Sequence, residues 1–221
     1  MSNGEERIGL YQWDAQIRAQ AGIEFLAGVD EAGAGPLAGR VYAAAVIPPQ
    51  GAELPYLNDS KKVTPRRRDL LFDLIREQAV SYSVAWAEAE EIDQLDILNC
   101  RMLAMQRAID QLNPAPQLVL VDGNRDHGSR CAITAPHQFV VKGDAHSASI
   151  AAASILAKVS RDRYMMELDR QYPEYLLAQH KGYPTKLHYE KIAQYGIQPF
   201  YRRSFLKKLG YSAEPDKDGS R

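Results

Sequence analysis

The segment from Phe25 to Gly39 constrains the fold more than any other stretch of the chain. A short apolar run typical of a buried strand ends at two adjacent carboxylates, Asp30 and Glu31, and a glycine-rich loop follows at once. Carboxylates at the end of a buried strand stay ionised only where a cation or hydrogen-bond donors satisfy them. Glycines beside them let another molecule approach the backbone closely. The pattern indicates a metal site beside a substrate path, and the alternative interpretation is a solvated turn.

The composition is that of an ordinary globular protein. The 221 residues, 45% hydrophobic and 25% charged, suffice for one domain with a full core. The formal charge of −1 lacks the basic excess typical of nucleic-acid-binding proteins, so binding of that kind has to come from local patches. Cys100 and Cys131 form neither a disulfide framework nor a zinc pattern, which favours a reducing compartment.

The sequence predicts no contact with a membrane. No apolar stretch approaches the roughly 18 residues that a membrane span needs. The start of the chain, Met1 to Arg7, lacks the apolar core of a signal peptide. We therefore expect a cytoplasmic protein, and a monomer, because no apolar surface stripe is left over.

Hydrophobic periodicity predicts alternating strands and helices, as in an α/β fold. Strands are expected at residues 25–30, 41–47, 81–87, 117–121 and 139–141, the first two forming a hairpin across the glycine-rich loop. Helices are expected at residues 10–20, 65–78, 88–112, 186–195 and 202–209, and from 145 with a second helical stretch to about 171. Thr64 is the expected N-cap of the second helix, with Pro65 as its first residue. These elements suggest an N-terminal segment 1–24, a domain 25–211 and a flexible tail 212–221.

Two further strand ends deliver an acidic residue beside a glycine. Asp122 follows the run 117–121, and Asp144 follows the run 139–141. Neighbouring strands that end at one edge of a sheet would bring these acids together with the first acidic pair. Each acid also has a purely structural interpretation: Asp122 suits a turn, Asp144 suits a helix N-cap, and Glu31 can simply face solvent.

Four carboxylates gathered at one sheet edge favour a particular metal chemistry. Hard oxygen ligands suit Mg²⁺ or Mn²⁺, and the chain has no cysteine or histidine cluster for zinc. Two divalent ions roughly 3.5–4 Å apart on such carboxylates form the arrangement used for in-line phosphodiester displacement. The acids therefore predict a metal-dependent phosphodiester hydrolase.

Basic and aromatic residues give weaker signs of nucleic-acid binding. Lys61, Lys62 and the run Arg66–Arg68 can hold phosphates, although a charge run is more often a solvated helix face. Tyr183 lies in a basic, glycine-flanked loop and can stack on a base or sugar, although a single tyrosine is more often packed at the edge of a core.

Taken jointly, several blocks resemble the bacterial ribonuclease HII family, the type 2 ribonucleases H. The blocks occur in the family's order, and the resemblance covers about Phe25 to Phe205. They are residues 27–33, 58–62, 121–124, 141–144, 150–162 and 180–185.

This resemblance implies a fold and an activity. The fold is ribonuclease H-like over residues 25–211: a mixed central sheet flanked by helices, with a helical C-terminal segment. The activity is cleavage of the RNA strand of RNA–DNA hybrids and of single ribonucleotides embedded in duplex DNA, as in ribonucleotide excision repair. The cut falls on the 5′ side of a ribonucleotide and leaves a 3′-hydroxyl and a 5′-phosphate, with Mn²⁺ or Mg²⁺ as the cofactor.

The resemblance also implies the site residues. Asp30, Glu31, Asp122 and Asp144 match the four catalytic, metal-binding acids of the family. We hypothesise that Asp30 and Asp122 are the core ligands, that one metal activates a water, and that the other stabilises the leaving 3′-oxygen. The residues implied in nucleic-acid binding are Gly33, Ala34 and Gly35 at the 2′-hydroxyl, Ser60 and Lys61 near the substrate backbone, and Tyr183 beside the junction sugar.

One residue departs from the family pattern. The family has Gly-Arg-Gly after the acidic pair, where this chain has Ala34 between Gly33 and Gly35. Loss of one charge-assisted contact costs about 1.5–3 kcal/mol, so anchoring of the adjacent phosphate is expected to weaken. Arg40 lies nearby in the sequence and is a candidate to replace the missing guanidinium.

Two other functions remain open on the sequence alone. A binding protein with impaired catalysis would hold hybrid or ribonucleotide-containing duplex without cutting it, although a pure binder has no reason to gather negative charge beside phosphate. A different nuclease of the same superfamily, such as an exonuclease or a resolvase, would cleave all-DNA substrates.

Overall fold

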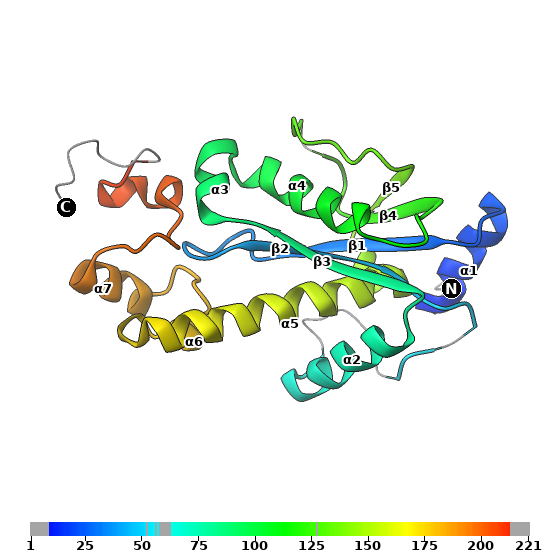
Figure 1. The fold of residues 1–221 in the computed structure, drawn as a ribbon, viewed down its shortest axis with the longest axis horizontal. Coiled ribbons are helices and arrows are strands. Elements are labelled where there is room, and N and C mark those ends of the chain that lie inside the picture. Colours follow the sequence, from blue (N-terminus) through cyan, green and yellow to red (C-terminus); the bar gives the residue numbers. More distant parts are fainter. Residues whose placement is uncertain (1–8, 52, 56, 58–62, 127, 213–221) are drawn as a thin grey trace, which may run out of the picture.

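A five-stranded sheet forms the centre of the molecule (Figure 1). The computed structural model describes residues 9–51, 53–55, 57, 63–126 and 128–212. The strand order is β3-β2-β1-β4-β5. The strands are β1 (Leu26–Ala32), β2 (Val41–Ile47), β3 (Ser81–Ala87), β4 (Leu118–Asp122) and β5 (His137–Val140).

The sheet is mixed, which determines where its strand ends meet. β1 and β2 form the expected antiparallel hairpin, and β3 pairs antiparallel with β2. β4 runs parallel to β1, with Val29 opposite Val121, and β5 runs parallel to β4. The C-terminal ends of β1, β4 and β5 therefore lie at the same edge, as the sequence predicts.

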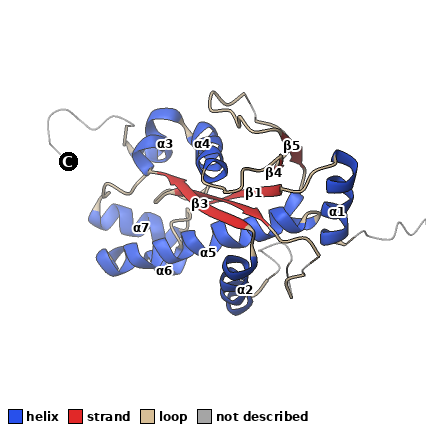
Figure 2. Ribbon diagram, turned by 45° about the vertical axis from the view of Figure 1, so that its right-hand side comes forward, coloured by secondary structure: helices blue, strands red, loops and turns tan. Residues whose placement is uncertain are grey.

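Helices cover both faces of this sheet (Figure 2). On one face α4 (Ile97–Asp110) packs its buried methionines against the small and branched residues of β1, β2 and β4. On the other face α5 (Ala148–Gln171) lies against β1 and β2, with α2 (Pro65–Gln78) beside it. The remaining helices and 3₁₀ turns are α1 (Leu10–Ala21), α3 (Ala89–Leu95), η1 (Gly143–Ala145), η2 (Pro173–Tyr175), α6 (Leu177–His180), α7 (Lys186–Tyr195) and η3 (Arg203–Leu209).

The single helix expected over residues 88–112 is wrong. The chain breaks it at Asp96, whose φ of 72° lies in the left-handed region. The Asp96 side chain then accepts a hydrogen bond from the Asn99 N–H and caps α4. Hydrophobic periodicity misses such a break because the apolar residues keep their spacing of three and four across it, although Ile92 packs in a different cluster from Met102 and Met105.

Three smaller expectations also need correction. Ser147, and not Asp144, is the N-cap of α5, because its hydroxyl accepts a hydrogen bond from the Ile150 N–H. The last strand begins at His137 and ends at Val140 instead of covering residues 139–141. The expected helix at residues 202–209 is the 3₁₀ turn η3.

The C-terminal elements pack around a separate aromatic cluster. α6, α7 and η3 gather at one end of the molecule (Figure 1), where the buried rings of Tyr175, Phe200 and Tyr201 contact one another. Within the described part of the chain, no helix is both long and apolar enough to cross a membrane. Apart from Ser212, the tail expected at residues 212–221 lies outside the described residues.

Candidate active site

The four acidic residues singled out in the sequence line one pocket. Asp30 and Glu31 come from β1, Asp122 is the last residue of β4, and Asp144 lies in η1, which follows β5. The pocket measures about 340 Å³. It is also lined by Ala32, Gly33, Arg68, Ser154, Lys158, Arg161 and Tyr183. The parallel pairing of β1 with β4 and of β4 with β5 is the reason why residues so far apart in sequence meet here.

Two of the acids are fixed by backbone donors. Asp30 is buried, and its Oδ1 accepts a hydrogen bond from the Glu31 N–H at 2.7 Å. The Asp122 Oδ1 accepts a hydrogen bond from the Gly143 N–H at 2.7 Å, which ties the end of β4 to η1. A side chain at Gly143 would collide with Ile150 and crowd this carboxylate, so the glycine permits the close approach.

The carboxylates in the pocket are not fully balanced by hydrogen-bond donors and cationic side chains. Burial, followed by the charges of Glu31 and Asp122, raises the pKa of Asp30 well above its ordinary value. Burial also raises the pKa of Glu31, although the Arg101 guanidinium opposes the shift from 2.6 Å. The Glu31 Oε2 is buried and has no hydrogen-bond partner among the described residues.

These observations fit a hard divalent cation. As the side chains lie, no three acidic, histidine or cysteine residues within the described ranges form a ready cluster for an ion. Carboxylates repel one another when no cation lies between them. Glu31 accordingly pairs with Arg101, and Asp122 accepts a hydrogen bond from the Gly143 N–H. A cation would satisfy the Glu31 Oε2 and would lower both raised pKa values. The donors are oxygen atoms alone, which suits Mg²⁺ or Mn²⁺.

The glycine-rich loop and Tyr183 border the same pocket. Gly33 has a φ of 96°, and a Cβ at this position would lie 2.2 Å from the Arg161 Nε, so the residue has to be glycine on both counts. A Cβ at Gly35 would meet the Tyr183 ring at 3.9 Å. Tyr183 is 41% exposed and is therefore accessible to a partner. Ser60 and Lys61, which were expected at the substrate backbone, lie outside the described residues.

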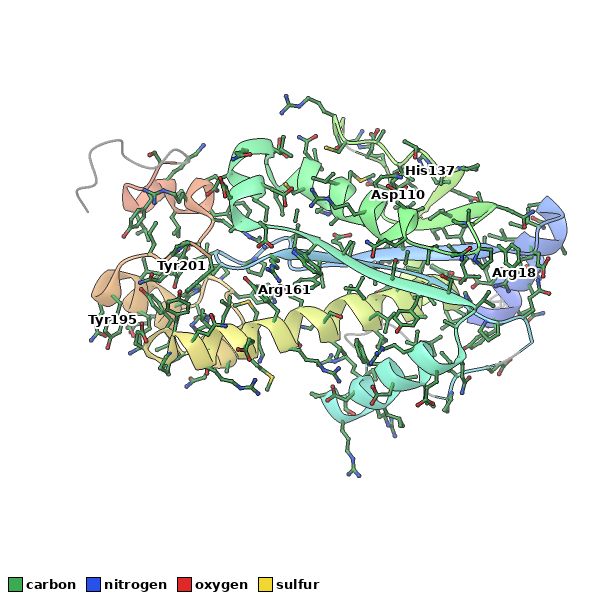
Figure 3. The ribbon with its side chains drawn as sticks, in the orientation of Figure 1. Arg18, Asp110, His137, Arg161, Tyr195 and Tyr201 are labelled. Atoms are coloured by element: carbon green, nitrogen blue, oxygen red, sulfur yellow. The ribbon has the colours of Figure 1, made fainter. Side chains whose placement is uncertain are left out.

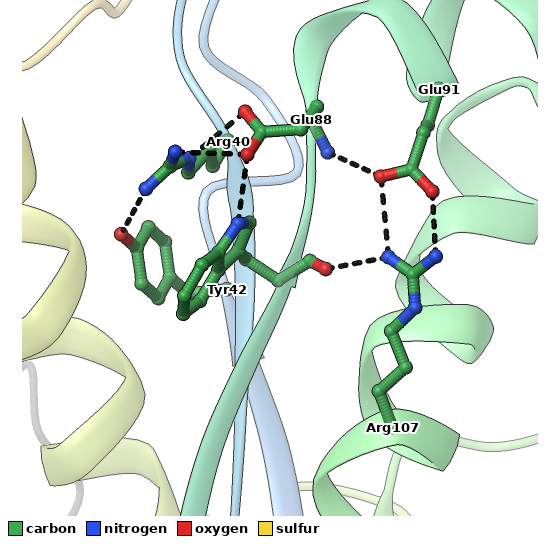
Figure 4. A network of polar contacts seen from close by, with 6 residues as sticks. Arg40, Tyr42, Glu88, Glu91 and Arg107 are labelled. Carbon is green, nitrogen blue, oxygen red and sulfur yellow. Dashed lines mark hydrogen bonds and ion pairs between the residues drawn. The ribbon is translucent and has the colours of Figure 1, made fainter.

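Arg40 does not take the place of the missing arginine. Its guanidinium forms two contacts of 2.9 Å with Glu88 and one of 3.4 Å with the Tyr42 hydroxyl (Figure 4). It also lies over the rings of Trp86 and Tyr164, at 4.8 and 4.6 Å from their centres. All three guanidinium nitrogen atoms thus contact side chains of this chain, and these contacts hold the group at Glu88.

Sequence reasoning missed the contribution of α5 to the pocket. Ser154, Lys158 and Arg161 are spaced by four and three residues, so they share one face of the helix and reach the pocket together. Arg161 projects from α5 toward the sheet (Figure 3). Polar residues at this spacing within an alanine-rich helix are the signal that could have identified them. Arg101, the partner of Glu31, has no comparable signal, because only the fold brings α4 over the end of β1.

Comparison with known proteins points in one direction. Residues 27–208 match the family model described as Ribonuclease HII. Ribonuclease H2 from Pyrococcus horikoshii OT3 superposes with a TM-score of 0.69 at 28% identity, covering 82% of this chain and 93% of that one.

Two further structures share the fold. The RNase HII of the PCNA:RNase HII complex from Archaeoglobus fulgidus gives a TM-score of 0.62 at 25% identity, covering 81% of this chain and 94% of that one. Bst-RNase HIII in complex with Mn²⁺ gives 0.61 at 19% identity, covering 78% and 63%. The mixed sheet with its flanking helices is the ribonuclease H-like fold expected from the sequence.

Proposed function

Since this chain belongs to the ribonuclease HII family and is thus a ribonuclease H, we propose that it cuts the RNA strand of RNA–DNA hybrids and single ribonucleotides embedded in duplex DNA. The observation that carries this proposal is the shared pocket of Asp30, Glu31, Asp122 and Asp144 with Tyr183 and Gly33. One nucleotide in this pocket could therefore contact the metal-binding acids, the Tyr183 ring and the main chain at Gly33.

The acids are proposed to hold the divalent cofactor, Mn²⁺ or Mg²⁺, with Asp30 and Asp122 as the core ligands. At such sites divalent ions lower the pKa of water and stabilise charge on the leaving oxygen. The water oxygen attacks the phosphorus on the 5′ side of the ribonucleotide, and the bond to the 3′-oxygen breaks. The 3′-oxygen takes up a proton, so the products are a 3′-hydroxyl and a 5′-phosphate.

The cationic residues in the same pocket suit the phosphates on either side of the cut. Lys158 and Arg68 line both this pocket and a neighbouring one of about 400 Å³ that also includes Arg163 and Lys181. Lysine and arginine bind phosphate chiefly through charge. Asp69 and Asp162 also line the neighbouring pocket, where Lys158 pairs with Asp162 at 2.7 Å and Arg163 with Asp69 at 3.3 Å. Four cationic residues against two acidic ones still leave this pocket with an excess of positive charge, which supports phosphate binding in a chain whose net charge is −1.

Selection of ribose over deoxyribose is assigned to the glycine-rich loop and Tyr183. Only a ribose offers a 2′-hydroxyl that can donate and accept hydrogen bonds. Gly35 is exposed next to the Tyr183 ring, so a sugar stacked on that ring would also meet the backbone of the loop. Ala34 contributes no guanidinium, and the recognition is therefore proposed to rely on main-chain groups.

The whole chain is proposed to act in ribonucleotide excision repair. Residues 25–211 would form the catalytic domain, which is supported by the family match over residues 27–208. A cytoplasmic monomer is the state that we infer from the sequence.

A cleavage assay with three duplexes tests this function. An RNA–DNA hybrid, a DNA duplex with one ribonucleotide and an all-DNA duplex are incubated with the protein and Mn²⁺ or Mg²⁺. We expect cutting of the first two on the 5′ side of a ribonucleotide, and none of the third. Cleavage of all three would instead support an exonuclease or a resolvase.

A binding protein is the second candidate, because Ala34 removes a phosphate contact and Arg40 does not replace it. A gel-shift experiment on the same duplexes tests it directly. A duplex with one ribonucleotide that is shifted but stays uncut with either metal would favour the binding protein and reject the hydrolase.

A further inference from the structure

The Arg202 side chain lies at the back of the glycine-rich loop. It belongs to the C-terminal segment, directly before η3, and is completely buried. Its guanidinium donates hydrogen bonds to five backbone carbonyl groups, all within residues 33–40. The acceptors are Gly33 (2.7 Å), Ala34 (3.0 Å), Pro36 (2.8 Å), Gly39 (2.9 Å) and Arg40 (3.1 Å).

Burying the charged Arg202 guanidinium costs free energy, so its position beside the loop points to a specific role. Burial, followed by the nearby charge of Arg161, lowers the pKa of Arg202 to about 9. A buried cation is tolerated only when its hydrogen bonds are satisfied. Arginine offers five donors in a fixed planar fork, whereas lysine offers three at a single point. Only arginine can therefore gather so many carbonyl groups around one centre.

The direction of these carbonyl groups fixes the direction of the loop N–H groups. In a planar trans peptide the carbonyl oxygen and the following N–H point in opposite directions. Because the carbonyls of Gly33 and Ala34 point inward to Arg202, the N–H groups of Ala34 and Gly35 point away from it. No described residue accepts a hydrogen bond from either group, and Gly35 is exposed.

Two other segments hold the loop beside Tyr183. The Leu37 N–H donates to the Gly182 carbonyl at 2.8 Å, and the Arg202 N–H donates to the Leu37 carbonyl at 2.9 Å. Arg161 packs under Gly33, donates to the Lys181 carbonyl at 2.7 Å and lies 5.5 Å from the centre of the Tyr183 ring. The loop and the ring therefore keep a fixed relation to each other.

We propose that Arg202 is a positioning residue for ribonucleotide recognition, which turns the N–H groups of Ala34 and Gly35 toward the 2′-hydroxyl of the ribonucleotide. The inference rests on the proposed function and extends it. It gives the C-terminal segment a part in substrate selection although that segment supplies no acid to the pocket. This role of Arg202 matters more here than it would with an arginine at position 34, because the loop can donate hydrogen bonds to the ribonucleotide only through its main-chain N–H groups.

Arg202→Gln and Arg202→Lys test this role. Steady-state cleavage and binding are measured on a DNA duplex with one ribonucleotide and on the matched all-DNA duplex, and circular dichroism and melting temperature report folding. We expect both variants to fold and Arg202→Gln to lose about 100-fold in kcat/KM, because an error of about 1 Å in positioning has a cost of that order. Its binding preference for the ribonucleotide duplex should fall to about one. Arg202→Lys should lose less of both, because it keeps the charge and part of the hydrogen bonding.

Arg203→Gln is the matched control, because this neighbouring arginine donates to the Ser212 carbonyl and not to the loop. It should keep the preference of the wild type. An unchanged preference in both Arg202 variants, or equal loss of binding to the two duplexes, would overturn the proposal. If both variants fail to fold, the preference of the wild type for the ribonucleotide duplex still tests the proposal, because its absence would overturn it.

The two proposals fail in different ways. If the wild-type protein cuts none of the duplexes, the proposed function is wrong. The binding preference of the wild type and of the Arg202 variants still decides the positioning role in that case. A wild-type protein that shows no preference between the two duplexes would overturn the positioning role itself.

Discussion

Individual side chains in the pocket are held by partners that oppose their charge or fix their orientation. Glu31 shows this clearly, because one of its oxygens pairs with Arg101 at 2.6 Å while the other has no partner among the described residues. The interpretation of Glu31 as a residue that simply faces solvent is therefore wrong. We propose that this second oxygen is the one that binds a cation.

Asp122→Asn is expected to abolish cleavage and to leave the fold intact. The amide oxygen can still accept the Gly143 N–H, but the negative charge that a divalent ion requires is gone. We expect a loss of at least about 100-fold in kcat on the duplex with one ribonucleotide. Asp126→Asn is the matched control, since Asp126 is exposed and does not line the pocket. Turnover like that of the wild type in Asp122→Asn would refute the metal assignment.

Ala34→Arg is expected to strengthen recognition of the ribonucleotide. Ala34 is partly exposed and its carbonyl already binds Arg202, so a longer side chain can extend outward without disturbing the loop. One new charge-assisted contact with phosphate is worth about 1.5–3 kcal/mol, which corresponds to about tenfold to a hundredfold in affinity. Equilibrium binding to the ribonucleotide duplex measures this gain. The same affinity in both proteins would mean that the main chain already supplies the contact.

The C-terminal elements hold the Tyr183 loop through a buried histidine pair. The rings of His180 and His188 stack with their centres 4.0 Å apart. His188 contacts the Tyr183 carbonyl oxygen through Nδ1 at 2.9 Å and the Tyr201 hydroxyl through Nε2 at 3.0 Å. Burial, followed by the proximity of His180, lowers the pKa of His188 to about 4. Both imidazole rings have to be uncharged for the C-terminal elements to keep this packing around Tyr183 and Tyr201.

The stability of the protein is therefore expected to depend on His188 in mildly acidic solution. The pKa of His188 is depressed in the folded state, so the unfolded chain binds the extra proton, and stability rises with pH. The contribution is complete above about pH 6.5 and is lost as the pH falls toward 4. Between pH 7 and pH 5 we expect the wild type to lose about 2 kcal/mol more than His188→Gln does.

Urea unfolding of the two proteins across this pH range measures the difference. The exposed His137, changed to Gln, serves as the control and should follow the wild type. An identical pH dependence in wild type and His188→Gln would contradict the assignment of the pair.

At the scale of the whole molecule, the contact between α5 and the sheet decides whether the layers fit. A Cβ at Gly28 in β1 would lie 2.1 Å from the Ser149 carbonyl carbon and 2.2 Å from the Ile150 nitrogen. Both of these are backbone atoms of α5. At Gly28 the helix therefore contacts the strand with no side chain between them. This contact determines how far Ser154, Lys158 and Arg161 of α5 lie from the sheet.

Gly28→Ala is expected to destabilise the protein and to impair cleavage together. The methyl group would push α5 away from β1, which we expect to reduce the free energy of unfolding by about 3 kcal/mol. Gly9→Ala is the control, because nothing lies within 4 Å of a Cβ there. Gly9 is the N-cap of α1, where alanine is less favourable than glycine, so we expect a loss of no more than about 1 kcal/mol. Urea unfolding measures both variants. Stability like that of the wild type in Gly28→Ala would show that α5 is free to move.

Local signals in the sequence were sufficient for most of the elements. β2, β3, α2 and α7 begin and end where apolar periodicity and capping residues place them, and Thr64 caps α2 as expected. The break at Asp96 escaped because a positive φ leaves no mark on a hydrophobic pattern. The meeting of Asp30, Asp122 and Asp144 was predictable, because each acid lies near or just after the C-terminal end of a strand, and parallel neighbours end at the same edge.

By itself, therefore, the sequence determined the alternation of strands and helices, the acids at the strand ends and the glycines beside them, because these depend on residues close together in the chain. Tertiary structure alone decided that Arg101 pairs with Glu31, that Arg40 is engaged by Glu88, and that Arg202 gathers the carbonyls of the glycine-rich loop. Those contacts join residues that are 48 to 169 positions apart. A charged side chain selects its partner by distance in space and by burial, and neither quantity can be read from the local order of residues.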